Sequence, residues 1–257
     1  MESTDQIDRQ KVIAEFDRRA SVHGNMNAVL DAGTTEEISR LNILRDEMTR
    51  RSLMKLLKPC KEDDILDFGC GVGRLSHQAA KKARSVSGFD PSSEMIRIAG
   101  ETYGAQNNLN FSASLPEKPA SFSKIFTVWV LQHIGDQELE TLLKDFARLI
   151  KPGGKVVILE QTRQWRRILS DIHIHRTREE YIALFRAAGF RCVKSGQVMR
   201  IPSYANWIYG KLGCTCKICL KLMCFIEKIS MPYRTDRIQY HTSGMIFVHD
   251  SKSDQYD

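Results

Sequence analysis

An acid and three alternating glycines end the first apolar run of the central part of the chain, which reads Ile-Leu-Asp-Phe-Gly-Cys-Gly-Val-Gly over residues 65–73. Because glycine has no Cβ atom, a ligand can approach the backbone of this loop, whose amides bind polar and anionic groups. A second acid, Asp90, follows about 20 residues later at the end of the next apolar run, where a βαβ unit binds ribose hydroxyls. The spacing therefore predicts a site for a nucleotide-like cofactor.

The competing interpretation is a dinucleotide-binding oxidoreductase, whose loop has the spacing G-x-G-x-x-G and whose helix N-terminus receives a pyrophosphate. In this chain Arg74 occupies the sixth position, and the glycines have the spacing G-x-G-x-G. With the acid two residues before it, this loop resembles motif I of the class I S-adenosylmethionine-dependent methyltransferases. The acidic dipeptide Asp90-Pro91 is similar to the loop after the second strand of that family.

Two later segments resemble the same family in the same order. FSKIFTVWVLQHI, at residues 122–134, is similar to the fourth strand and the loop after it, and LIKPGG, at residues 149–154, is similar to the turn before the fifth strand, KVVILE. The resemblance covers roughly residues 60–190. Four signals in agreement favour the methyltransferase over the oxidoreductase.

The resemblance implies that the cofactor is S-adenosylmethionine. A carboxylate at the strand end and the glycine-loop amides suit its amino-acid end, and Asp90 suits both ribose hydroxyls. Met95 either packs on the adenine or fills the core, and the family often carries an acid at the position of Ser114, beside the base edge. The cofactor contacts expected are Asp67, Gly69, Cys70, Gly71, Gly73, Asp90, Pro91, Met95, Ser114, Leu115 and Trp129.

Three histidines are candidate bases for a methyl transfer that must remove a proton from a hydroxyl. His133 is the first candidate, because it follows the fourth strand at the edge where open α/β sheets bind ligands. His173 and His175 follow the fifth strand and share a side if their segment is extended. They could serve as base and orienter or as a metal pair, and a purely structural loop role remains open for His133. We expect no metal.

Short apolar runs alternate with helical patterns through the middle of the chain, which is typical of a parallel sheet covered by helices on both faces. Two late apolar runs resemble the antiparallel pair that closes the sheet of this family. We therefore expect an α/β, Rossmann-like doubly wound sheet of seven strands, mostly parallel with an antiparallel C-terminal strand. The strands expected are 65–68, 85–89, 109–112, 124–129, 156–160, 190–193 and 245–248, and the helices are 74–83, 93–101, 136–149 and 178–188.

The remaining segments flank this core. Helical patterns over about 5–20 and 36–57, the second stopped by Pro59, predict an N-terminal helical cap. The domain organisation expected is a cap at 1–60, a cofactor-binding core at 61–195, an insertion at 196–240 and the last strand with a tail at 241–257.

The insertion contains four cysteines, Cys214, Cys216, Cys219 and Cys224, which suggest a metal cluster. At about 100° per residue, however, Cys216 and Cys219 share an apolar helix face, whereas lysines gather opposite. This predicts a basic amphipathic helix, and aromatic residues precede it. A lid over the acceptor pocket, a peripheral membrane or lipid-carrier contact through 207–228, and zinc or thiol chemistry remain open.

Positive charge is concentrated in the C-terminal part of the chain. Residues 161–257 carry 16 Lys and Arg against 8 Asp and Glu, whereas residues 1–160 carry 22 against 23, within a total of +7. An anionic acceptor, a phosphate-bearing carrier, a membrane surface or nucleic acid would each suit this charge, and so would a solvated basic surface.

No apolar run approaches the roughly 18 residues of a membrane span, and residues 1–20 are too charged for a signal peptide. The seven cysteines have no even framework of spacings. These features predict a cytoplasmic protein with reduced thiols.

The resemblance implies an enzyme that methylates a small-molecule or carrier-linked acceptor, most simply at a hydroxyl oxygen. One alternative is an RNA or protein methyltransferase that uses the basic C-terminal part. Against it, residues 128–132 read VWVLQ, without the Asn/Asp-Pro-Pro-Tyr/Phe run that grips a planar amino group, and no RNA-binding module is recognisable. A cofactor-binding subunit without catalysis is the other alternative.

Overall fold

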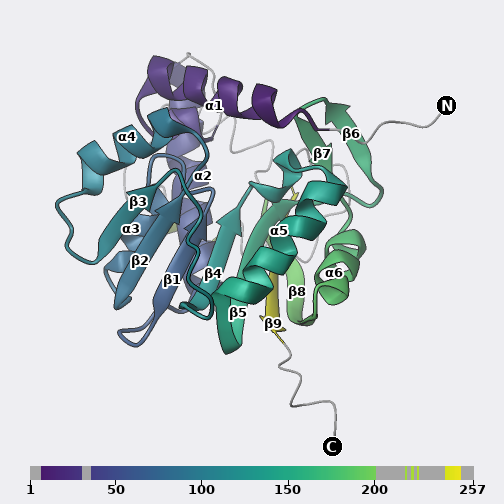
Figure 1. The fold of residues 1–257 in the computed structure, drawn as a ribbon. Helices are drawn as coiled ribbons and strands as arrows, with labels where there is room; N and C mark the ends of the chain where they lie inside the picture. The colour runs from purple at the N-terminus through teal and green to yellow at the C-terminus, as the bar shows by residue number, and fades with distance from the viewer. Residues whose placement is uncertain are drawn as a thin grey trace, which may run out of the picture.

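A seven-stranded sheet forms the centre of the computed structural model, which describes residues 7–30, 36–200, 218, 221, 222, 225 and 241–249 (Figure 1). The strands in chain order are β1 (Asp64–Phe68), β2 (Ser85–Phe89), β3 (Leu109–Ser112), β4 (Phe122–Val128), β5 (Ile150–Gln161), β8 (Phe190–Arg200) and β9 (His241–His249). In the sheet they take the order β3-β2-β1-β4-β5-β9-β8. The five strands from β1 to β5 pair in parallel, and β9 runs antiparallel to both of its neighbours. The predicted Rossmann-like fold is confirmed.

Helices cover both faces of the sheet (Figure 1). They are α2 (Glu36–Leu57), α3 (Arg74–Ala80), α4 (Ser93–Tyr103), α5 (Asp136–Leu149) and α6 (Arg178–Ala187). Residues of α2 and α3 pack on one face, and those of α5 and α6 pack on the other. In α5 the apolar residues recur at helical spacing, and Leu139, Leu142, Leu143, Phe146 and Leu149 are all buried. The inner strands are buried on both faces, so they read as continuous apolar runs.

The N-terminal helix α1 (Arg9–His23) lies across the carboxyl ends of the parallel strands (Figure 1). One end is attached to α4, because Asp17 accepts hydrogen bonds from the hydroxyl of Ser92 and from the backbone N–H of Glu94. The other end is attached near β7, since the N–H of Asp8 donates to the carbonyl of Asp171 at 2.7 Å. Helix α1 therefore bridges two distant parts of the sheet edge.

Two short strands, β6 (Arg167–Ser170) and β7 (His173–His175), form a hairpin outside the main sheet that the sequence patterns do not predict. Strand β8 also continues to Arg200, past position 195 where we expect the core to end. Its added residues pair with β9 as far as His241, and these ladder hydrogen bonds explain the extension.

Most of the expected insertion, including Cys214, Cys216, Cys219 and Cys224, lies outside the described residues. Within it, the structure describes Ile218, Lys221, Leu222 and Phe225 as helical and exposed. The cysteines that are described, Cys60, Cys70 and Cys192, form no disulfide. In the described part of the chain, no helix has both the length and the hydropathy to cross a bilayer.

Substitution of Phe146 by alanine should destabilise the fold by about 3–5 kcal/mol, because a buried aromatic ring that packs edge-on against Phe68 at 5.2 Å is removed. Urea denaturation measures the change, with Lys144→Ala on the exposed face of the same helix as the control. The control should stay within about 0.5 kcal/mol of the wild type. A loss below about 1 kcal/mol for Phe146→Ala would contradict this packing.

Candidate active site

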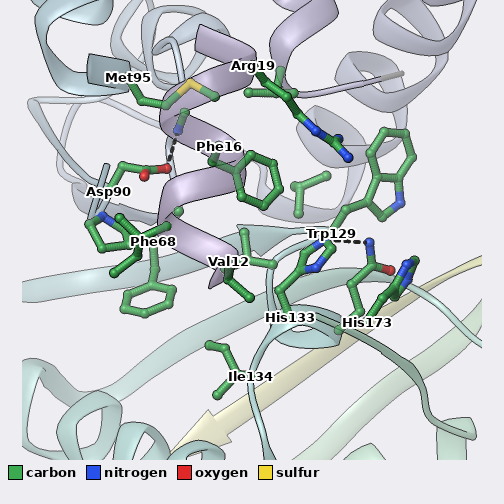
Figure 2. A pocket seen from close by; sticks show the side chains of 18 of the residues that line it. Val12, Phe16, Arg19, Phe68, Asp90, Met95, Trp129, His133, Ile134 and His173 are labelled. Carbon is green, nitrogen blue, oxygen red and sulfur yellow. Dashed lines mark hydrogen bonds between the residues drawn. The ribbon is translucent and has the colours of Figure 1, made fainter. Parts of the chain in front are cut away.

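A cavity of about 420 Å³ lies at the carboxyl edge of the parallel strands, within the size range of ligand pockets. Figure 2 shows Phe16 of α1 between Asp90 on one side and His133 on the other. We call the side lined by Gly69, Gly71, Asp90, Pro91 and Met95 the glycine-loop half, and the side lined by Arg19, Trp129, Gln132, His133 and His173 the histidine half. The two halves are one continuous space.

The glycine loop and Asp90 hold each other in place. Gly69 has a φ of +76°, a left-handed conformation that glycine adopts without strain, and its N–H donates to the carbonyl of Phe89 at 2.7 Å. The Asp90 carboxylate accepts from the N–H of Gly71 at 2.8 Å and from the N–H of Ser92 at 3.0 Å. Burial raises the pKa of Asp90 to about 6, although both hydrogen bonds oppose this.

Asp67 has a different environment from Asp90. Its side chain is buried and accepts the hydroxyl of Ser76, which belongs to the helix after the glycine loop. Burial raises the pKa of Asp67 to about 7. Because Asp67 does not line the cavity, its direct contact with the cofactor stays a prediction.

Some of the residues expected around the cofactor line the cavity, and others do not. Gly69, Gly71, Asp90, Pro91, Met95 and Trp129 line the cavity, whereas Cys70, Gly73, Ser114 and Leu115 do not. Leu115 instead packs against the hydrophobic core between the sheet and α5. Met95 is buried against a cluster from α1 and α4, so it combines core packing with a place on the cavity wall.

In the histidine half, His133 lies on a short 3₁₀ turn, η2 (Leu131–His133). Its Nδ1 lies 2.6 Å from the carbonyl oxygen of Ile172. Because a carbonyl oxygen can only accept a hydrogen bond, Nδ1 carries the proton. The Nε2 atom is then an acceptor, 3.3 Å from the side-chain nitrogen of Gln132. Burial lowers the pKa of His133 to about 4, so the ring is neutral at pH 7.

The loop that carries His133 is held by a buried acid and a buried arginine. One carboxylate oxygen of Glu160 accepts from the backbone N–H of Val130 at 3.0 Å and of Leu131 at 2.9 Å. Arg176 donates to the carbonyls of Leu131 at 2.8 Å and Ile134 at 2.6 Å. Two backbone donors and two backbone acceptors of the loop are therefore paired with buried side chains.

Trp129 begins this loop in a left-handed conformation, with a φ of +59°, which is uncommon for a residue other than glycine. Its backbone N–H donates to Leu159 at 2.8 Å, and its indole N–H donates to Thr242 at 3.3 Å. These bonds to β5 and β9 maintain the strained backbone.

The structure brings the three predicted histidines together. The ring centroid of His173 lies 4.9 Å from that of His133 and 4.6 Å from that of His175. His173 lines the cavity, whereas His175 lies behind it, 2.9 Å from the Oε1 of Gln161. No group of three His, Cys, Asp or Glu residues suited to a metal occurs among the residues described.

Several residues of the cavity wall are absent from the sequence predictions. Arg19 and Phe16 come from α1, and Gln132 comes from η2. The ring of Phe16 packs edge-on against His133 at 5.3 Å. The helical pattern of residues 5–20 predicts this helix, but a local pattern does not indicate that the helix lies over the cavity.

Residues 65–154, which carry the glycine loop, Asp90 and His133, match a family profile described as a methyltransferase domain. The demethylmenaquinone methyltransferase of Tropheryma whipplei (strain Twist) is 29% identical over 148 residues, which are 56% of this chain and 56% of that protein. The chain thus matches about half the length of this curated relative.

Solved structures of low identity share the fold. Haemonchus contortus phosphoethanolamine N-methyltransferase 1, solved with phosphoethanolamine and S-adenosylhomocysteine, has a TM-score of 0.66 at 16% identity, covering 96% of this chain and 50% of that one. A Leishmania major S-adenosylmethionine-dependent methyltransferase has a TM-score of 0.64 at 15% identity, covering 93% and 82%. Residues 65–154 therefore form a methyltransferase domain, and the glycine loop, the acid and the sheet order resemble those of the class I S-adenosylmethionine-dependent methyltransferases.

Proposed function

We propose that the protein transfers the methyl group of S-adenosylmethionine to a hydroxyl oxygen of a small-molecule or carrier-linked acceptor. The observation that carries this proposal is the continuous cavity, with Asp90 and the glycine loop in one half and the acceptor nitrogen of a neutral His133 in the other. A neutral imidazole beside the cofactor site is suited to accept the proton of a hydroxyl.

The glycine-loop half fits the cofactor chemically. Asp90 is a partly buried carboxylate with one hydrogen bond to each oxygen, so each oxygen keeps an acceptor site for a ribose hydroxyl. Gly71 has a φ of +52° and lines the cavity, and the side chain of Val29 occupies the space that a Cβ atom on Gly71 would take. Met95, in the first turn of α4, offers a polarisable surface for the adenine ring.

The bound sulfonium supplies an electrophilic methyl group, and the chain must align the acceptor and remove its proton. His133 would take the proton at Nε2 while its Nδ1–H remains bonded to the carbonyl of Ile172, which also orients the ring. Phe16 packs against this ring from α1 and so limits the access of water.

The relatives support a small acceptor over RNA. The Tropheryma whipplei relative is named for demethylmenaquinone, and Arabidopsis thaliana phosphoethanolamine N-methyltransferase 3, 29% identical over 121 residues, is named for phosphoethanolamine. The latter match covers 45% of this chain and 25% of that protein. Nitrogen as the methylated atom is therefore the principal alternative to oxygen.

Replacement of Asp90 by alanine should weaken the binding of S-adenosylhomocysteine by at least about tenfold, because a charge-assisted acceptor of hydroxyl hydrogen bonds is lost. Calorimetric titration measures the affinity, and circular dichroism verifies the fold. Asp145→Ala, on the outer surface of α5, is the matched control and should bind normally. Near-normal affinity of Asp90→Ala would refute the assignment of Asp90.

Cofactor affinity should also depend on pH. The ionised carboxylate is the better acceptor, so the affinity for S-adenosylhomocysteine should rise as the pH passes upward through the pKa of about 6 of Asp90 and level off above it. Titrations from pH 5 to 8 should show this rise in the wild type and a weaker one in Asp90→Asn. The same rise in both proteins would assign it to another group.

Replacement of His133 by alanine should lower turnover by about 10²-fold or more while cofactor affinity remains nearly unchanged, because only proton removal is affected. The assay measures release of S-adenosylhomocysteine with hydroxylated metabolites, anionic carriers, amines and RNA as acceptors. His77→Ala on α3, outside the cavity, is the control.

Unchanged turnover of His133→Ala across a pH series would move the base to His173 or His175, or remove the need for one. Methylation of RNA alone, or of amines alone, would contradict the proposed reaction at a hydroxyl.

A further inference from the structure

Arg19 extends from α1 into the histidine half of the cavity, toward Trp129 (Figure 2). Its Nε donates to Glu15 at 2.8 Å, and its Cζ lies 5.2 Å from the ring centroid of Phe16. Among the residues that the structure describes, its two terminal nitrogens have no hydrogen-bond acceptor. One edge of the guanidinium is thus fixed by the protein, and the other edge is available to a ligand.

The positive charge of Arg19 is only partly offset by its ion pair with Glu15. Its Glu15 partner is shared with Arg18, which makes two further bonds to the same carboxylate. The histidines do not compensate, because burial holds His133 neutral and Arg19 itself disfavours the protonated ring.

Neither of the two acids that line the cavity, Asp90 and Glu138, pairs with Arg19. Asp90 lies in the glycine-loop half, and Glu138 pairs with Arg9 at 2.7 Å. A sulfonium bound beside them would add another positive charge. Since like charges in a partly desolvated site repel, an anion in the histidine half would stabilise the loaded cavity.

Two buried polar atoms of the histidine half also lack partners. They are the Oε1 of Gln132, whose residue is 5% exposed, and the Nε2 of His173. Both residues line the cavity. Unpartnered buried polar atoms are costly, so these two indicate a polar ligand that forms hydrogen bonds in this half.

We propose that the methyl acceptor carries a carboxylate or phosphate group, that the terminal nitrogens of Arg19 bind this anion, and that Gln132 and His173 bind its remaining polar groups. The proposal rests on the proposed function, because it places the acceptor in the histidine half. The anion would offset the repulsion between the guanidinium of Arg19 and the sulfonium. The planar guanidinium suits both a carboxylate and a phosphate, so both share this recognition chemistry.

The test is a titration of the protein, saturated with S-adenosylhomocysteine, with benzoate, phenyl phosphate and neutral benzamide. Binding is followed by calorimetry and by the side-chain ¹⁵N resonances of arginine. We expect saturable binding of at least one anion, and the anion that binds more tightly identifies the preferred group. Benzamide should bind more weakly than that anion.

The substitution Arg19→Gln should weaken anion binding by about tenfold or more and leave benzamide unaffected. Arg18→Gln is the matched control, because Arg18 pairs with the same Glu15 but does not line the cavity. It should bind the anion as the wild type does.

Failure of both anions to bind saturably would overturn the proposal, as would equal losses in Arg18→Gln and Arg19→Gln. Failure of S-adenosylhomocysteine itself to bind is a separate outcome that contradicts the proposed function. In that case the same anion titration of the ligand-free protein still tests Arg19.

Discussion

The arrangement of the active site depends on two buried side chains, Glu160 and Arg176, which form hydrogen bonds with the backbone of the loop after β4. Both side chains are fully buried, and each uses its charge on the loop backbone. Glu160 accepts from two N–H groups, whereas Arg176 donates to two carbonyls and to Asp136. These hydrogen bonds offset part of the cost of burying the two side chains, and the second carboxylate oxygen of Glu160 has no hydrogen-bond partner among the described residues. Burial nevertheless raises the pKa of Glu160 to about 7.

The loop in turn fixes the cavity. It sets the left-handed backbone of Trp129, presents His133 to the space above the sheet and leaves Gln132 facing the same space. The hairpin of β6 and β7 then supplies the carbonyl of Ile172 to His133 and places His173 against its ring. A change in the loop backbone would therefore alter both the candidate base and the acceptor contacts.

Helix α1 connects the two halves of the site. Asp17 bonds to the start of α4 beside the glycine-loop half, and Phe16 packs against His133 in the other half. Arg19, three residues after Phe16, adds positive charge to the cavity wall. Helix α1 thus contributes to the wall of both halves of the cavity, which gives the N-terminal cap a direct part in the site.

The sequence by itself determined the sheet and the position of Asp90 after β2, because these follow from local periodicity and from the spacing of glycines and acids within one βαβ unit. The cofactor class came from the resemblance of these motifs to those of a known family. The sequence also indicated His133 and His173 as candidates at the correct edge. Only the tertiary structure decided that Asp67 bonds to Ser76, that β6 and β7 form a hairpin, and that Arg19 enters the cavity. The physical reason is that these features depend on packing between elements far apart in the chain, and no local pattern records such contacts.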